Sequence, residues 1–174
     1  MNKSVWFFEE VDLYEILCPY KYNDHLKSHP LSCYNKTDFL FMEGDVVREL
    51  YLVAEGRVKV GFYDKEGNEQ VIAFLGRGEI LGEKAIFGDD RHKEFAQVVA
   101  DHTMICKLRV EKARELARDY VPFSLTLTKR FGERMQRLER RLQILLFKDA
   151  RQRLVEFVKD ICRDFGVPYR TGVK

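Results

Sequence analysis

The sequence is poor in the features that build cross-linked, secreted or membrane-spanning proteins. Its four cysteines, Cys18, Cys33, Cys106 and Cys162, form no C-x-x-C pair, so neither a zinc knuckle nor a disulfide framework is expected. No stretch approaches the roughly 18 uninterrupted apolar residues that a membrane helix requires. The first residues, MNKSVWFFEEVDL, carry acids where a signal peptide would be apolar. We therefore expect a cytoplasmic protein with reduced thiols.

Charge is plentiful but unevenly distributed along the chain. Residues 1–128 hold 17 Lys and Arg against 22 Asp and Glu, whereas residues 129–170 hold 12 against 6. A basic segment can indicate an anionic partner, although a solvated helix face gives the same pattern. The 174 residues, 45% of them hydrophobic, are enough for one sizeable core with additional helices.

The segment 34–109 is dominated by a period of two residues, which is typical of half-buried strands. Val58 and Val60, for example, alternate with charged neighbours. Turn residues interrupt the pattern at Gly56 and at Gly67, where a positive φ costs little. This pattern predicts several short antiparallel strands, and hence a sandwich, a jelly roll or a small barrel.

After Val110 the apolar period lengthens to that of a helix. An apolar stripe with spacings of 4, 4, 3, 4 and 3 residues runs through Leu127, Phe131, Met135, Leu138, Leu142 and Leu145. It predicts one helix of roughly 25 residues. Because a small barrel cannot cover so long a stripe, we expect it to form a dimer interface with a second copy of the chain. The alternative is that this helix lies along the roll as part of its core.

A further helix is expected after Asp149, and it should end at Gly166, a favoured residue just after a helix, with Pro168 beyond it. The chain is therefore expected to have three parts. These are a β-roll with flanking helices at 1–120, a long helix at 121–147 and a final region at 148–174.

Three segments resemble the Crp–Fnr regulators, which are relatives of the cyclic-AMP receptor protein, and more broadly the cyclic nucleotide-binding domains. The segments are FMEGDVVRELYLVAEGRVKVGFYDKEGNE at 41–69, LGRGEILGE at 75–83 and RMQRLERRLQILLFKDARQRLVEF at 134–157. Five glycines also fall at turns of the family: Gly44, Gly56, Gly67, Gly78 and Gly82. Together these features cover nearly the whole chain.

The resemblance implies an α+β fold. An antiparallel β jelly roll that binds an effector would be flanked by N-terminal helices and followed by a long dimerisation helix and one further helix. In such regulators a C-terminal winged helix-turn-helix reads the DNA. That module has no counterpart in this sequence, so we expect the sensory and dimerisation portion of a regulator that ends before its DNA-binding domain.

The resemblance also points to a binding cassette. In the nucleotide-binding members, a Gly-Glu pair contacts the ribose and an arginine about eleven residues later neutralises the cyclic phosphate. Gly82 and Glu83, followed by Lys84, match the pair, but the alignment puts Glu94 at the position of the arginine. Losing such a charge-assisted contact costs about 1.5 to 3 kcal/mol before any repulsion is added. The sequence therefore predicts weak binding of cyclic AMP.

The long helix carries a second departure from the family. The two adjacent hydroxyl residues that contact adenine in the cyclic-AMP binders align with Leu138 and Glu139. Two alternatives stay open. A genuine cyclic nucleotide sensor would use Arg91 or Lys93 in place of the arginine, and a cupin-like interaction module would work alone.

The basic residues of the long helix are candidates for holding an anionic effector. They recur at helical spacing as Arg130, Arg134, Arg137 and Arg141, although pairing with nearby glutamates is the simpler expectation. No pattern of catalytic or metal-binding residues is present. We therefore expect no enzyme activity and no metal site, and the sequence names no cofactor.

Overall fold

The computed structural model describes residues 31–165, 168–169 and 172–173. The chain divides into two compact units, Met1–Thr128 and Lys129–Lys174, here called the roll unit and the helical unit. The N-terminal helices that the resemblance implies fall on residues 1–30, outside the described residues.

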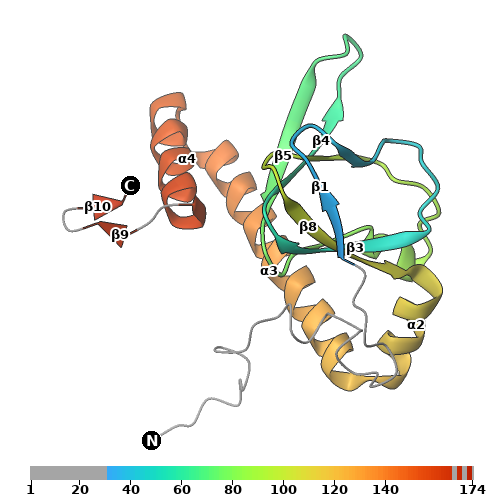
Figure 1. Cartoon of the computed structure of the whole chain (residues 1–174). Coiled ribbons are helices and arrows are strands. Elements are labelled where there is room, and N and C mark those ends of the chain that lie inside the picture. The colour runs from blue at the N-terminus through green and yellow to red at the C-terminus, as the bar shows by residue number, and fades with distance from the viewer. Residues whose placement is uncertain (1–30, 166–167, 170–171, 174) are drawn as a thin grey trace, which may run out of the picture. The chain divides into compact units, whose positions relative to one another are not determined.

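The roll unit is built from two four-stranded antiparallel sheets (Figure 1). The first sheet has the order β1-β8-β3-β6 and the second has the order β2-β7-β4-β5. The strands are β1 (Leu31–Tyr34), β2 (Phe39–Phe41), β3 (Glu49–Glu55), β4 (Val58–Tyr63), β5 (Glu69–Leu75), β6 (Ile80–Leu81), β7 (Phe95–Val98) and β8 (Thr103–Arg109). The predicted jelly-roll type of fold is confirmed, with most neighbouring strands far apart in sequence.

The core of the roll consists of the inward-facing residues that the alternating pattern supplies. Val53 pairs with Ile105 across β3 and β8, and Val58 pairs with Val98 across β4 and β7. All four belong to one buried cluster, which also contains Phe41, Val60, Leu75, Leu81 and Ala96. Each valine or larger apolar side chain of this cluster that is removed from water stabilises the fold by about 1.5 to 3 kcal/mol.

All five glycines that carry the family resemblance have a positive φ, between 75° and 88°. Gly56 shows why one of these turns requires glycine. A Cβ at this position would lie 2.2 Å from the hydroxyl oxygen of Thr103 and 2.8 Å from its Cα. Both the backbone conformation and the space at Gly56 therefore exclude a side chain.

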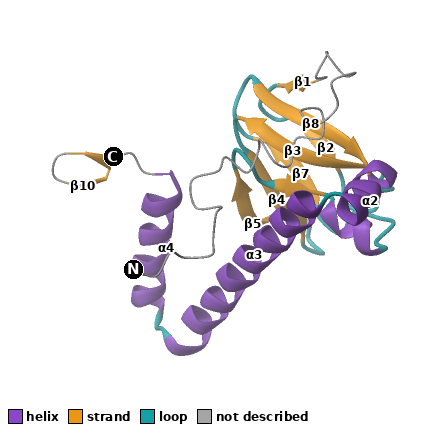
Figure 2. Ribbon diagram, turned by 90° about the horizontal axis from the view of Figure 1, so that it is seen from below, coloured by secondary structure: helices purple, strands orange, loops and turns teal. Residues whose placement is uncertain are grey.

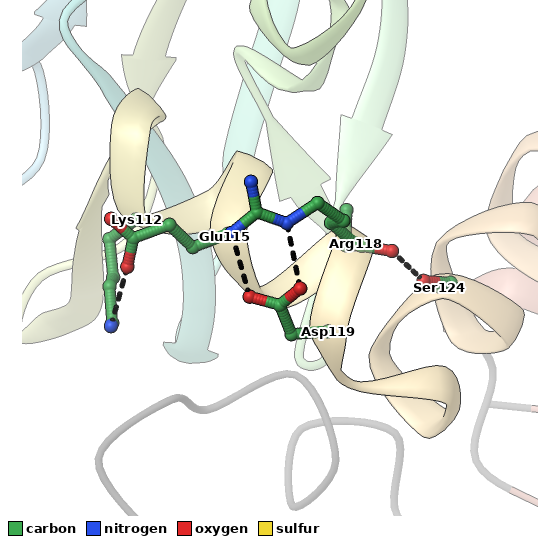
Figure 3. A network of polar contacts seen from close by, with 6 residues as sticks. Lys112, Glu115, Arg118, Asp119 and Ser124 are labelled. Carbon is green, nitrogen blue, oxygen red and sulfur yellow. Dashed lines mark hydrogen bonds and ion pairs between the residues drawn. The ribbon is translucent and has the colours of Figure 1, made fainter.

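Two helices follow β8, namely α2 (Val110–Asp119) and α3 (Val121–Phe147). The turn between them is held by a hydrogen bond from the Ser124 hydroxyl to the Ala117 carbonyl. Figure 3 shows Ser124 and the nearby ion pair between Arg118 and Asp119. The start of α3 belongs to the roll unit, and there Phe123 is only 1% exposed.

The helical unit contains the rest of α3, which spans 27 residues in all, and α4 (Ala150–Phe165). Figure 2 shows both as regular helices. Asp149 caps α4, because its carboxylate accepts a hydrogen bond of 2.8 Å from the Gln152 amide. Between the two helices, the Arg140 guanidinium pairs with both Glu156 and Asp160, at 3.1 and 2.9 Å.

The end of α4 at Phe165 agrees with the expected stop at Gly166, which itself lies outside the described residues. Two short paired strands beyond it, β9 (Pro168–Tyr169) and β10 (Gly172–Val173), were not expected. Of the described helices, none is both long enough and apolar enough to span a membrane.

The apolar stripe of α3 is exposed along the helical unit. Met135, Leu138, Leu142 and Leu145 are between 54% and 61% exposed, and Phe131 is partly buried. Leu127 is different because it lies in the roll unit and is only 4% exposed. Leu127 therefore exposes little of its own surface, and its place in the dimer interface stays a prediction.

Candidate effector cassette

The predicted cassette lies between β6 and β7 in the roll unit. The backbone leaves β6, turns at Gly82 and forms a short 3-10 helix, η2 (Glu83–Phe87), which ends at Gly88. Gly82 has a φ of 75°, and a Cβ there would lie 2.9 Å from the Glu49 carbonyl oxygen. Glycine is therefore required at this turn whether or not a ligand binds.

The short helix η2 is fixed to the roll unit at both ends. Glu83 in its first turn is only 4% exposed. At the other end, the guanidinium of Arg114 on α2 donates a hydrogen bond of 2.6 Å to the Ala85 carbonyl and one of 3.4 Å to that of Ile86. The Ala85 carbonyl also accepts a hydrogen bond from the Gly88 amide, so the end of η2 is held by both the backbone and a cation on α2.

Glu94, which the resemblance aligns with the family arginine, forms an ion pair with Lys84. The Lys84 Nζ lies 3.0 and 2.9 Å from the two carboxylate oxygens. The Glu94 side chain is 10% exposed and that of Lys84 is 44% exposed, so the carboxylate is the buried partner. The sequence predicted the repulsive acid but not the ammonium that neutralises it.

His92 is a further residue of the cassette that the sequence analysis missed. It is 6% exposed and stacks on Phe41, with ring centroids 3.5 Å apart and planes 9° apart. Burial lowers the pKa of His92, and the charge of Lys84 acts in the same direction, while Glu94 and Asp45 oppose this shift. No spacing rule marks such a histidine, because its partners come from other strands and loops.

The two cations proposed as substitutes for the arginine have other partners. Arg91 donates a hydrogen bond of 2.7 Å to the Gly44 carbonyl and lies in an isolated β-bridge with Val46. Lys93 pairs with Asp89 at 3.2 Å, with its side chain 68% exposed. In this arrangement it is Lys84, rather than Arg91 or Lys93, that faces the Glu94 carboxylate.

The remaining predicted effector residues lie in the helical unit. Leu138 and Glu139 are exposed and Arg134 is partly buried, and their role in effector binding stays a prediction. The expected pairing of Arg130 with Glu133 is present, at 2.9 Å. Within the described ranges, no group of three or more metal-binding side chains comes together.

Fold and cassette together define the class of protein: a β-roll sensor domain continued by a long helix. The chain belongs to the cyclic nucleotide-binding domain family, whose model matches residues 32–120. The predicted likeness to Crp–Fnr regulators is likewise confirmed by the relatives that follow.

Two curated regulators and one solved structure illustrate the relationship. The chain is 25% identical over 142 residues to the global nitrogen regulator of Synechocystis sp., covering 81% of this chain and 63% of the relative. It is 28% identical over 140 residues to the cAMP-activated global transcriptional regulator CRP of Haemophilus influenzae, covering 80% and 60%. The structure of a CooA mutant from Carboxydothermus hydrogenoformans matches with 27% identity and a TM-score of 0.72, covering 94% of this chain and 71% of that one.

The chain thus spans about six tenths of the length of these curated relatives. What it shares with them is the sensing part. The names of these relatives differ in the signal they mention, so family membership alone leaves the effector of this chain undefined.

Proposed function

We propose that this chain is the effector-sensing and dimerisation portion of a Crp–Fnr-type transcription regulator that acts in the cytoplasm and does not respond to cyclic AMP. The observation that carries the proposal is the buried Glu94 carboxylate, which stands at the arginine position and is already paired with Lys84. A cyclic phosphate placed there would meet a carboxylate in place of a guanidinium.

The proposed role is regulatory and not catalytic. An effector bound beside Gly82, Glu83 and Lys84 would change the preferred pairing of two α3 helices, and the change would reach DNA through a helix-turn-helix domain of the kind the relatives imply. A role for Arg134, Leu138 and Glu139 in effector binding is proposed from the family resemblance alone. This coupling is carried over from the family.

The dimer part of the proposal is supported by the exposed stripe of α3. Four large apolar side chains that are more than half exposed on one helix form an unusual surface for a single chain. A second copy covers such a stripe most simply, because identical stripes are self-complementary about a two-fold axis.

Native mass spectrometry of the purified chain tests the proposal. We expect twice the mass of one chain and, where a molecule is retained, one that is not a cyclic nucleotide. A retained mass equal to that of cyclic AMP or cyclic GMP would support the alternative of a genuine nucleotide sensor. A monomer at micromolar concentration would contradict the dimer and favour a module that works alone.

A further inference from the structure

The two side chains of the ion pair between Lys84 and Glu94 differ strongly in solvent exposure. Its carboxylate is 10% exposed and its ammonium 44% exposed. Both carboxylate oxygens lie within 3.0 Å of the Lys84 Nζ. A buried carboxylate needs such a partner, because an uncompensated charge in a dry site costs several kcal/mol. Lys84 therefore serves as the counter-ion of Glu94.

The backbone around this pair is held in place. Lys84 lies on η2, whose start is fixed by the close approach of Gly82 to Glu49 and whose end is fixed by Arg114. Glu94 directly precedes β7, whose first residue, Phe95, is completely buried. The backbone of both residues is thus held at the cassette, and a ligand at this position meets the buried carboxylate together with the ammonium.

The pair has different consequences for anionic and uncharged ligands. An anionic group that approaches the Lys84 ammonium comes close to the buried Glu94 carboxylate, so repulsion between the two negative charges offsets the attraction to the ammonium. An uncharged group meets no such cost. If the carboxylate were absent, the Lys84 ammonium, which is partly open to solvent, would offer a charge-assisted contact to a phosphate.

We propose that Glu94 is a built-in counter-ion that closes the cassette to anionic ligands, and that Lys84 is the latent anion-binding group of this site. The pair determines the specificity of the cassette. It selects an effector whose group next to Lys84 and Glu94 carries no negative charge. This inference rests on the proposed function, since it assigns a ligand class to the same cassette.

The roll offers a matched control for the experiment. Lys59 and Glu69 form a second lysine–glutamate pair with the same separation of ten residues, at 2.6 Å. It lies between β4 and β5, away from the cassette sequence. Glu69→Gln therefore removes the same charge from the same protein without touching Lys84.

The test is a calorimetric titration with cyclic AMP, and separately with inorganic phosphate, at low salt. We expect the wild type and Glu69→Gln to bind cyclic AMP too weakly for the titration to detect, while Glu94→Gln binds it with a dissociation constant at least about tenfold below the detection limit. The gain should disappear when Lys84→Met is added to Glu94→Gln. Glu94→Ala, which removes the same charge without an amide, should repeat the gain if Glu94→Gln does not fold.

The outcomes separate this inference from the proposed function. Binding of cyclic AMP by the wild type would overturn the proposed function. If the wild type, Glu94→Gln and Glu94→Ala are all folded and none of them binds cyclic AMP or phosphate, only the inference is overturned. The inference is also overturned if the gain in binding persists when Lys84→Met is added. A response to phosphate without one to cyclic AMP would support the latent anion site and show that the remainder of the cassette excludes the nucleoside.

Discussion

The two units of the chain solve the problem of burying apolar surface in opposite ways. The roll unit hides Phe95, Phe123 and Val53 almost completely and even buries two glutamates, Glu83 and Glu94. In the helical unit the contacts recorded between α3 and α4 include the ion pairs of Arg140 with Glu156 and Asp160, while leucines and phenylalanines remain exposed. The roll unit has a densely buried core, whereas the exposed stripe of α3 in the helical unit is the surface that we propose a second copy covers.

This difference agrees with the proposed roles of the two units, effector sensing by the roll unit and dimerisation by the helical unit. A sensor needs a rigid scaffold that sets the geometry of its cassette, and the dense packing of the roll supplies it. A dimerisation element needs surface that is buried only on association, and the exposed stripe of α3 supplies that.

The largest effect is expected when a phenylalanine is replaced by alanine in each unit and the losses of stability are compared. Phe123→Ala should destabilise the roll by about 3 to 5 kcal/mol, because its ring is fully buried. Phe147→Ala in the helical unit should cost less than about 1 kcal/mol, because that ring is 79% exposed. Urea unfolding followed by circular dichroism measures both. Equal losses would mean that the helical unit is covered in solution as thoroughly as the roll.

A somewhat smaller effect is expected from a charge on the apolar stripe. Leu138→Arg should weaken the dimer by about 2 kcal/mol or more, roughly thirtyfold, because it places a guanidinium where two stripes meet. Sedimentation equilibrium measures the dissociation constant. Gln136→Arg, on a different side of the same helix, is the control and should leave it nearly unchanged. If both variants dimerise equally, the stripe is not the interface.

The smallest expected effect is a pH dependence of the roll. Burial lowers the pKa of His92 in the folded state. As the pH falls through the ordinary histidine value near 6.5, the unfolded chain therefore binds this proton before the folded one does. Stability should be intact above that pH and decline below it. Thermal unfolding between about pH 5 and pH 8 measures the slope.

Two substitutions sharpen this pH prediction. His92→Phe keeps an aromatic ring on Phe41 and removes the titrating group, so its stability curve should be flatter in acid. His102→Asn, at an exposed turn with a positive φ of 55°, should leave the wild-type curve in place. A His92→Phe curve as steep as the wild type would assign the acid sensitivity to other groups.

Much of the fold was predictable because it follows from local patterns. Alternation predicted the strands, the glycines at Gly56 and Gly67 predicted turns, and the stripe predicted α3 to within a few residues. The burial of Leu127 within the roll unit was not predictable, because periodicity shows which face of a helix is apolar but not what covers it. The strand pair β9 and β10 is too short to produce a period.

The cassette was predictable only in part. The position of Gly82, Glu83 and Glu94 came from the family pattern, but the pairing of Glu94 with Lys84 depends on how a ten-residue loop folds back. His92 was missed for a related reason: its stacking partner, Phe41, is on β2, far away in the sequence. Contacts of this kind are set by tertiary structure, which no local spacing encodes.

The cassette, neutralised by its own ion pair, is proposed not to hold a cyclic phosphate. The direct measurement is an NMR titration of the ¹⁵N-labelled wild-type chain with cyclic AMP, followed at the amides of Gly82, Glu83, Lys84 and Glu94. We predict that these signals stay in place up to a concentration of about 1 mM. Saturable shifts of the same amides at micromolar cyclic AMP would contradict the account.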